Sequence, residues 1–500
     1  MTENGNDEIE SIIQSEIISP RRRNQLALTS NISTLSPIIR KIGPVKSQKK
    51  VKFGSSQSII RYGRLVHTRP ILIDELINEY ILECEYFKTK PIEKLINQLE
   101  EYNVVEGRLP KIDLSGIRLD HKTVETLEII FINLQTEFLN LENTMLDEDS
   151  CVAICEIIEY YDSASILHIG SNTRIGLLGW SSISRLVANS KSLKVLNMNR
   201  MVFTEQGVAC LSQALVKTRP LRSLYLVNCY LNGTRLKILM KGIFSTSKIE
   251  EFYLSENKIS SNDCSYIAEM IKVNKHLRVL DLENNSIQDL GLKYIFNSLV
   301  ESCATRLESL QLWNTGITSL GMQYLAPYLM SDKFSKESIS LRSLNIGKNK
   351  IGDEGLLFIK SALIQNTSLE RLGLASTRLS PSGIITLAEI IADNKYLIRV
   401  DLRDNNINEA GVLALSTALR HNTSMLKINF NANFKIDAEI EIVLNRAVDD
   451  IKLKCVENRE KAKSIGKIDD ATSLFSGLSL ESITLNNNFP AQSTLSSIFN

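Results

Sequence analysis

Residues 277–287 read "LRVLDLENNSI", and this stretch decides the fold because it recurs along the chain. Similar stretches are "LERLGLASTRL" at residues 369–379 and "LIRVDLRDNNI" at residues 397–407. Their shared frame has apolar residues at the first, fourth, sixth and eleventh positions, often with asparagine at the ninth. A pattern that recurs at a fixed interval is typical of repeat architectures.

The interval between most frames is 28 residues, and the longest is 34. This motif at this spacing predicts an α/β fold, a leucine-rich repeat solenoid of about twelve repeats in the ribonuclease-inhibitor-like horseshoe form. The frames begin at Leu109, Thr136, Ala164, Leu193, Leu221, Ile249, Leu277, Leu307, Leu341, Leu369, Leu397 and Met425.

Each frame predicts a short strand, a turn and then a helix. Leu280 and Leu282 are two residues apart, so both face one side of a strand. In the second half of a repeat, "GLLFIKSAL" from Gly355 has the apolar spacing of a helix. Because a helix is wider than a strand, stacked repeats must curve, with strands on the concave face and helices on the convex face.

The ninth position of the frame is expected to stabilise the turn that leaves the strand. A buried asparagine amide can satisfy backbone groups of that turn. Ile117, Met201 and Cys229 occupy this position in other frames and cannot do so, so looser turns are expected there. The asparagines are Asn257, Asn285, Asn349, Asn405 and Asn433.

The chain divides into four segments. Residues 1–69 form a basic arm that we expect to be disordered, with twelve Lys and Arg and no acidic residue between Arg21 and Arg69. Residues 70–108 predict a helical N-terminal cap with Asp74 as a helix N-cap. Residues 109–456 form the solenoid with its closing helix, and residues 457–500 a polar tail expected to be disordered.

Composition argues against several classes of protein. The chain has 58 Lys and Arg against 57 Asp and Glu, which favours no nucleic-acid partner. No apolar run reaches membrane-spanning length, the N-terminus "MTENGNDEIE" is not a signal peptide, and the eight cysteines show no metal-binding or disulfide spacing. We therefore expect an intracellular protein, cytoplasmic or nuclear, without a membrane contact, a metal or a cofactor.

No catalytic motif is present in the sequence. The five histidines lie far apart, and no phosphate-binding loop, nucleophile elbow or zinc-protease pattern occurs. The sequence therefore predicts a protein that is not an enzyme.

The concave face is the candidate binding surface of the repeats. The fifth, seventh and eighth positions of each frame face it, and several hold aromatic or charged residues of the kind used in interfaces. The alternative is that these are ordinary solvated strand residues. The candidates are Tyr225, Tyr253, Asp281, Glu283, Trp313, Asn314 and Arg403.

The arm contains a short motif, "KKVKF", at residues 49–53. It fits the RVxF motif that docks on protein phosphatase 1. Val51 and Phe53 are two residues apart, so both can enter apolar pockets when the segment adds as a strand to a sheet edge. The alternatives are a nuclear import signal, an arm for anionic surfaces, or a segment that packs on the solenoid. The docking residues would be Lys49, Lys50, Val51, Lys52 and Phe53.

From about Lys49 to about Phe430 the chain resembles the protein phosphatase 1 regulatory subunit 37 family. The resemblance is carried by "KKVKF" and by "LDEDS", "IIEYYDSA", "LQLWNTGIT", "IGDEG", "LGLAST" and "VDLRDNNI", which occur in this order between Leu146 and Ile407. It implies a regulatory, inhibitory subunit that binds the phosphatase catalytic subunit, with the docking motif at Lys50, Val51 and Phe53. Apart from the resemblance, the exposed residues of the concave face suggest a further protein partner there.

Two other readings use the same kind of repeat. A GTPase activator of the Ran type would act through the solenoid, but that family has a strongly acidic tail and this tail is nearly neutral. A ribonuclease-inhibitor-like binder would carry far more cysteines than the eight found here.

Overall fold

The computed structural model describes residues 71–244, 248–302, 306–331, 341–431 and 438–464. The chain forms two compact units, Met1–Asn257 and Lys258–Asn500, called here the N-terminal and C-terminal units. The arm with its motif at residues 49–53, the turn position Asn433 and the chain beyond Ser464 lie outside the described residues.

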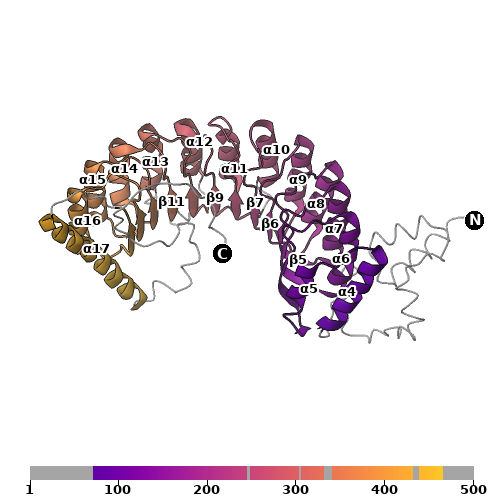
Figure 1. Cartoon of the computed structure of the whole chain (residues 1–500). Coiled ribbons are helices and arrows are strands. Elements are labelled where there is room, and N and C mark those ends of the chain that lie inside the picture. The colour runs from indigo at the N-terminus through magenta and orange to yellow at the C-terminus, as the bar shows by residue number, and fades with distance from the viewer. Residues whose placement is uncertain (1–70, 245–247, 303–305, 332–340, 432–437, 465–500) are drawn as a thin grey trace, which may run out of the picture. The chain divides into compact units, whose positions relative to one another are not determined.

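In the N-terminal unit six parallel strands follow one another in chain order, each followed by its connection to the next (Figure 1). Leu196 and Leu224 are partners on neighbouring strands and are fully buried. Burying a leucine of this kind contributes about 2 kcal/mol. The strands are β3 (Arg108–Asp113), β4 (Gln135–Asn140), β5 (Ala164–His168), β6 (Val195–Asn197), β7 (Ser223–Tyr225) and β8 (Glu251–Tyr253). The helices of its repeats are α6 (His121–Asn133), α7 (Glu148–Tyr161), α8 (Leu177–Asn189), α9 (Glu205–Lys217) and α10 (Gly233–Ile243).

The C-terminal unit repeats this arrangement, with Leu280, Leu310 and Leu344 as buried partners on successive strands. The α/β leucine-rich repeat predicted from the 28-residue period is therefore confirmed in both units. The strands are β9 (Val279–Asp281), β10 (Ser309–Gln311), β11 (Ser343–Asn345), β12 (Arg371–Gly373), β13 (Arg399–Asp401) and β14 (Lys427–Asn429). The helices are α11 (Cys264–Val273), α12 (Gln288–Glu301), the 3-10 turn η2 (Ser319–Gly321) with α13 (Met322–Ser331), α14 (Gly352–Gln365), α15 (Pro381–Asp393), α16 (Glu409–His421) and α17 (Ala438–Ser464).

Asparagine side chains bridge neighbouring repeats at several of the turns that follow a strand. The Asn257 amide nitrogen donates to the carbonyls of Leu226 and Leu254, at 2.7 and 2.9 Å. Its oxygen accepts from the backbone nitrogens of Cys229 and Leu231, at 2.9 and 3.0 Å. The looser turn predicted at Cys229 is therefore wrong, because the asparagine of the next repeat supplies its partners.

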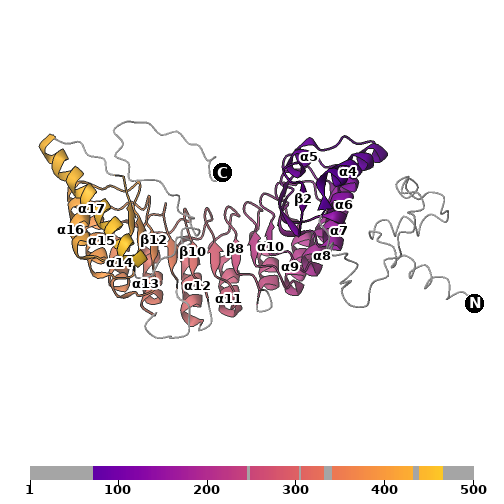
Figure 2. The same ribbon diagram turned by 90° about the horizontal axis from the view of Figure 1, so that it is seen from below.

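Two helices precede the first repeat strand (Figure 2): α4 (Ile73–Phe87), which packs beside α6, and α5 (Glu93–Leu99), which contacts β3. The short strands β1 (Ile71–Leu72) and β2 (Val104–Val105), which the sequence did not predict, pair antiparallel beside them. The prediction that Asp74 caps a helix is wrong. Helix α4 begins at Ile73, so Asp74 lies inside its first turn.

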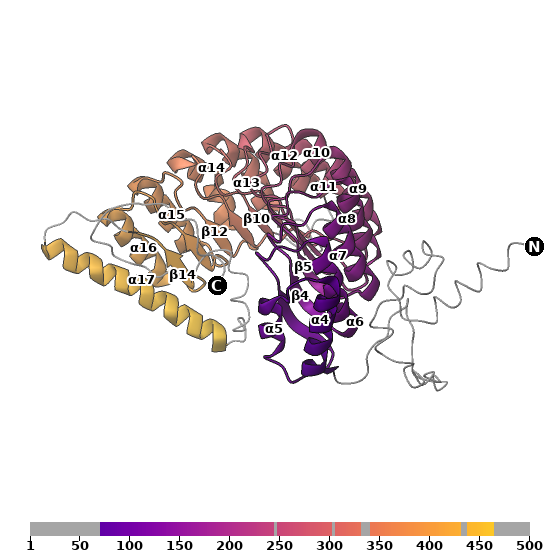
Figure 3. The same ribbon diagram turned by 45° about the vertical axis from the view of Figure 1, so that its right-hand side comes forward.

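The closing helix α17 (Ala438–Ser464) extends further than the sequence predicted (Figure 3). The predicted solenoid ended at residue 456 and a disordered tail began at 457, but the helix continues to Ser464. Asn458 explains the difference. Its side chain is 1% exposed and donates to the carbonyls of Asn422 and Met425, at 3.2 and 3.0 Å.

Candidate functional site on the strand face

The strand face of the C-terminal unit carries the side chains that alternate with the buried leucines. Leu280 and Leu282 point into the core, so Asp281 and Glu283 point to the opposite side. Asp281 Oδ1 accepts a hydrogen bond from the backbone nitrogen of Glu283, at 2.9 Å. These two carboxylates, at the end of β9 and in the turn after it, are therefore the first two residues of the candidate site.

Glu283 lies in a half-buried position where its charge is poorly solvated. The side chain of Asn345, on β11, donates a hydrogen bond to Glu283 Oε1 at 3.2 Å. This bond spans β10, which lies between β9 and β11. Burial raises the pKa of Glu283 to about 7, and the nearby charge of Asp281 adds to this rise. Glu283 therefore gains or loses its proton close to neutral pH.

Trp313 follows β10 and lies against the backbone of the next repeat. A Cβ placed on Gly347 would lie 2.3 Å from the Cε3 and Cζ3 atoms of the indole. Only glycine at residue 347 therefore leaves room for the ring in this position. The arrangement fixes the half-buried indole on the same face as Asp281 and Glu283.

Asn314 and Arg403 have partners other than Asp281, Glu283 and Trp313. The Asn314 amide donates to Asn284 Oδ1 at 2.8 Å, and Asn314 has a φ of 54°, so it shapes the turn. Arg403 binds Asp401 on its own repeat, with 2.7 Å between Nη2 and Oδ2. We define the acidic-aromatic cluster as Asp281, Glu283 and Trp313, and expect it to suit a cationic side chain.

The N-terminal unit has its own aromatic residues on the strand face. The rings of Tyr225 and Tyr253 stack with centroids 4.1 Å apart and planes 5° from parallel. Phe138 and His168 form an edge-to-face contact with centroids 4.7 Å apart, which the sequence analysis did not identify. Burial lowers the pKa of His168, which favours the neutral ring at neutral pH. Both pairs offer partly apolar, aromatic contact surface.

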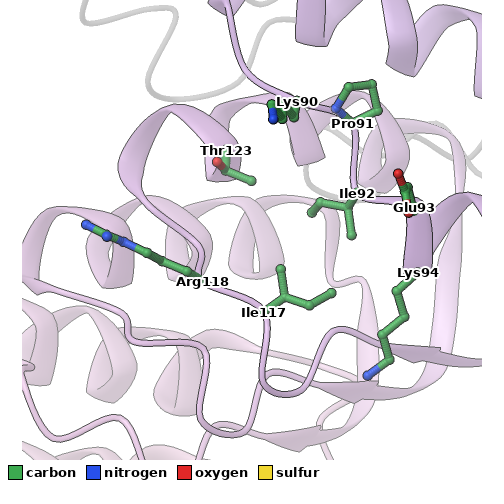
Figure 4. Close-up of a pocket in the computed structure, with 8 residues that line it drawn as sticks. All are labelled: Lys90, Pro91, Ile92, Glu93, Lys94, Ile117, Arg118 and Thr123. Atoms are coloured by element: carbon green, nitrogen blue, oxygen red, sulfur yellow. The ribbon is translucent and has the colours of Figure 1, made fainter.

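A pocket of about 610 Å³ lies in the N-terminal helical region, where Ile92 and Ile117 approach each other (Figure 4). Lys94 lines it, but its ammonium already contacts Asp113 Oδ1 at 3.3 Å and the Ser115 carbonyl at 3.1 Å. Arg118 points away from the two isoleucines in this view. The charged side chains of this pocket therefore do not point together toward one place where a ligand could bind.

The described residues offer no arrangement that suggests a metal centre. Among them, no three His, Cys, Asp or Glu side chains gather as metal ligands would. The seven cysteines within the described ranges are all free. No helix in the part of the chain that the structure describes has the length and apolar character needed to cross a membrane.

Comparison with known proteins agrees with this architecture. The leucine-rich repeat family pattern matches residues 273–296, 337–360 and 393–416. Protein phosphatase 1 regulatory subunit 37 of Bos taurus is 36% identical over 284 residues, which are 55% of this chain and 40% of that protein. The protein of the same name in Danio rerio is 34% identical over 301 residues, 59% of this chain and 32% of that protein.

The chain is similar to the protein phosphatase 1 regulatory subunit 37 family. It spans less than half the length of these curated relatives, 40% and 32%. The ribonuclease inhibitor of Sus scrofa is also similar, with 27% identity over 236 residues, 46% of this chain and 49% of that protein.

Proposed function

We propose that this chain is a regulatory subunit of protein phosphatase 1 that acts by binding and carries out no chemistry itself. The observation that carries the proposal is the likeness, over 55% of the chain, to relatives named as regulatory subunits of this phosphatase. The "KKVKF" motif at residues 49–53 also supports it, because it fits a known docking pattern for this enzyme.

Docking places two apolar side chains in the phosphatase and basic residues at its rim. Burying Val51 and Phe53 would each contribute roughly 1.5–3 kcal/mol. Ordering the segment costs about 2–5 kcal/mol, so the motif alone anchors modestly. A second contact is therefore needed for tight binding.

The strand face supplies that second contact in this proposal. The acidic-aromatic cluster of Asp281, Glu283 and Trp313 combines two carboxylates with an indole, and such a set attracts a Lys or Arg side chain. The partner on this face is the phosphatase itself or a further protein held beside it. Inhibition follows from covering or redirecting the phosphatase surface.

An activity assay tests the inhibitory part of the proposal. We expect the rate at which the phosphatase catalytic subunit dephosphorylates a phosphoprotein to fall as this chain is added. The Val51→Ala, Phe53→Ala double variant should need at least about tenfold more protein for the same inhibition. The matched control is Ile59→Ala, Ile60→Ala, which removes apolar side chains from the same arm and should inhibit as the native chain does. An unchanged rate at saturating native protein would contradict inhibition.

A further inference from the structure

Three basic residues form a row across the strand face of the C-terminal unit. Arg371 on β12 is the register partner of Arg399 on β13, and Arg399 is the partner of Lys427 on β14. All three are half-buried and occupy the third position of successive frames. Neighbouring strands lie about 4.8 Å apart, so three cations share a span of about 10 Å.

The three residues of the row form no ion pair with a carboxylate in the described part of the chain, although the charge of Asp401 acts on Lys427. In the described part of the chain, Arg342 pairs with Glu370 and Arg403 with Asp401, whereas no ion pair includes Arg371, Arg399 or Lys427. Like charges directly opposite each other on neighbouring strands destabilise a sheet. A row of this kind is therefore a cost to the unit unless an anion occupies it.

Helix α17 adds a fourth cation at the end of the row. The Arg459 guanidinium donates to the carbonyl of Leu426, the residue before Lys427, at 3.3 Å. Burial, followed by the charges of Arg371 and Arg459, lowers the pKa of Arg399. Burial also lowers the pKa of Lys427, with further contributions from Arg399, Arg459 and Arg403 that outweigh the opposing charge of Asp401. Four cations thus converge on one area of the strand face.

We propose that this row, Arg371, Arg399 and Lys427 together with Arg459, binds a phosphorylated side chain of a partner protein. A phosphate group carries about −1.5 to −2 charge and three acceptor oxygens, so it can balance two cations and accept several hydrogen bonds. Arginine binds phosphate in a bidentate manner, and arginine clusters are a recurring means of phosphopeptide recognition. One carboxylate would balance only one member of the row.

The surroundings favour a protein ligand over a nucleic acid. A nucleic acid strand would extend beyond the row along the face, and the same unit carries Asp281 and Glu283 on β9 and in the turn that follows it. Those carboxylates would repel the neighbouring phosphates of a polyanion, whereas a peptide with a single phosphate can place a basic residue there. The face is therefore suited to a segment of mixed charge.

Fluorescence anisotropy with the whole chain tests this inference. The probes are a labelled peptide mixture, degenerate except for a central phosphoserine, and the same mixture with serine. In about 0.1 M salt we expect the phosphorylated mixture to bind at least tenfold more tightly. Equal binding of the two mixtures, or equally tight binding of a labelled single-stranded DNA, would overturn the proposal.

One variant removes the three strand residues of the row, a second removes only Arg399, and a matched control leaves the row intact. Arg371→Gln, Arg399→Gln, Lys427→Gln should lose at least tenfold in affinity for the phosphorylated mixture, and Arg399→Gln alone should lose a smaller share. The control Lys272→Gln, Lys360→Gln, Lys452→Gln removes the same charge from exposed ion pairs elsewhere in the unit. Full binding by the control supports the site, and an equal loss in the control overturns it.

The temperature of thermal unfolding distinguishes a binding role of the row from a purely structural one. Because the triple Gln variant relieves repulsion, its unfolding midpoint in low salt should rise above that of the native chain. The native midpoint should also rise when the phosphorylated mixture is added. A lower unfolding midpoint in the Arg371→Gln, Arg399→Gln, Lys427→Gln variant and in the Arg399→Gln variant, together with no stabilisation of the native chain by the phosphorylated mixture, would show a structural role. That result would overturn the proposal.

Discussion

At the scale of single residues, the turns of this protein depend on side-chain amides that cross between repeats. The sequence predicted the set at the ninth position of the frame, of which Asn257 and Asn349 are buried members. It missed a second set, three residues before a frame begins. Asn394 donates to the Leu363 carbonyl at 2.6 Å and accepts from the Leu397 nitrogen at 2.7 Å. In the sequence this second set is marked only by an asparagine three residues before an apolar residue. Ordinary loops have the same pattern, so it did not stand out.

Glu283 is a residue of the candidate site whose charge changes near neutral pH. In the folded protein its pKa is raised to about 7, by burial first and by Asp281 second, from 4.5 for an exposed glutamate. A raised pKa means that the folded state holds the proton more tightly than the unfolded state. The stability that this proton provides is fully present below pH about 4.5 and is lost as the pH rises to about 7.

The variant Glu283→Gln should isolate the part of the protein's stability that depends on protonation of Glu283. Gln keeps an oxygen that can accept from Asn345, and it carries no charge to bury. We expect the variant to unfold at a higher temperature than the native chain at pH 8 and at nearly the same temperature at pH 4.5. Differential scanning calorimetry at the two pH values measures this. A difference of equal size at both values would show that the Glu283 charge is not its cause.

At the scale of secondary-structure elements, the period of the frames predicted where strands and helices alternate, because core leucines recur at fixed spacing. The length of α17 could not be predicted in the same way. Its last turns are polar, and only the contacts of Asn458 and Arg459 with the final repeat reveal that they belong to the folded unit. The placement of Trp313 against Gly347 is likewise a contact between repeats that no local pattern contains.

Two truncations of the chain test the role of the last turns of α17. Ending the chain after residue 456 removes Asn458, which leaves the carbonyls of Asn422 and Met425 without that donor. An unsatisfied buried group costs about 1–3 kcal/mol, so α16 and β14 should exchange their amide hydrogens faster. Ending the chain after residue 464 keeps the helix and should leave exchange unchanged. Equal protection in both truncations would show that these turns do not close the array.

At the scale of the whole molecule, the proposed anchor and the proposed binding surface lie in different parts of the chain. The anchoring segment, Val51 and Phe53, lies in the basic arm and was inferred from sequence alone. Within the C-terminal unit, the strand face presents Asp281 and Glu283 from β9 and its turn, and Arg371, Arg399 and Lys427 from β12 to β14. The sequence identified the first group as candidates. It did not identify the second, because only the fifth, seventh and eighth positions of the frame were considered as binding positions, whereas these three residues occupy the third.

The most direct test of the central claim is calorimetric titration of the protein phosphatase 1 catalytic subunit into the whole chain. The native chain should bind with a Kd near or below micromolar. The Val51→Ala, Phe53→Ala variant should lose at least tenfold, about 1.4 kcal/mol, while Ile59→Ala, Ile60→Ala should bind as the native chain does. Absence of binding by the native chain, or full binding by the Val51→Ala, Phe53→Ala variant, would contradict the claim that the arm anchors this protein to the phosphatase.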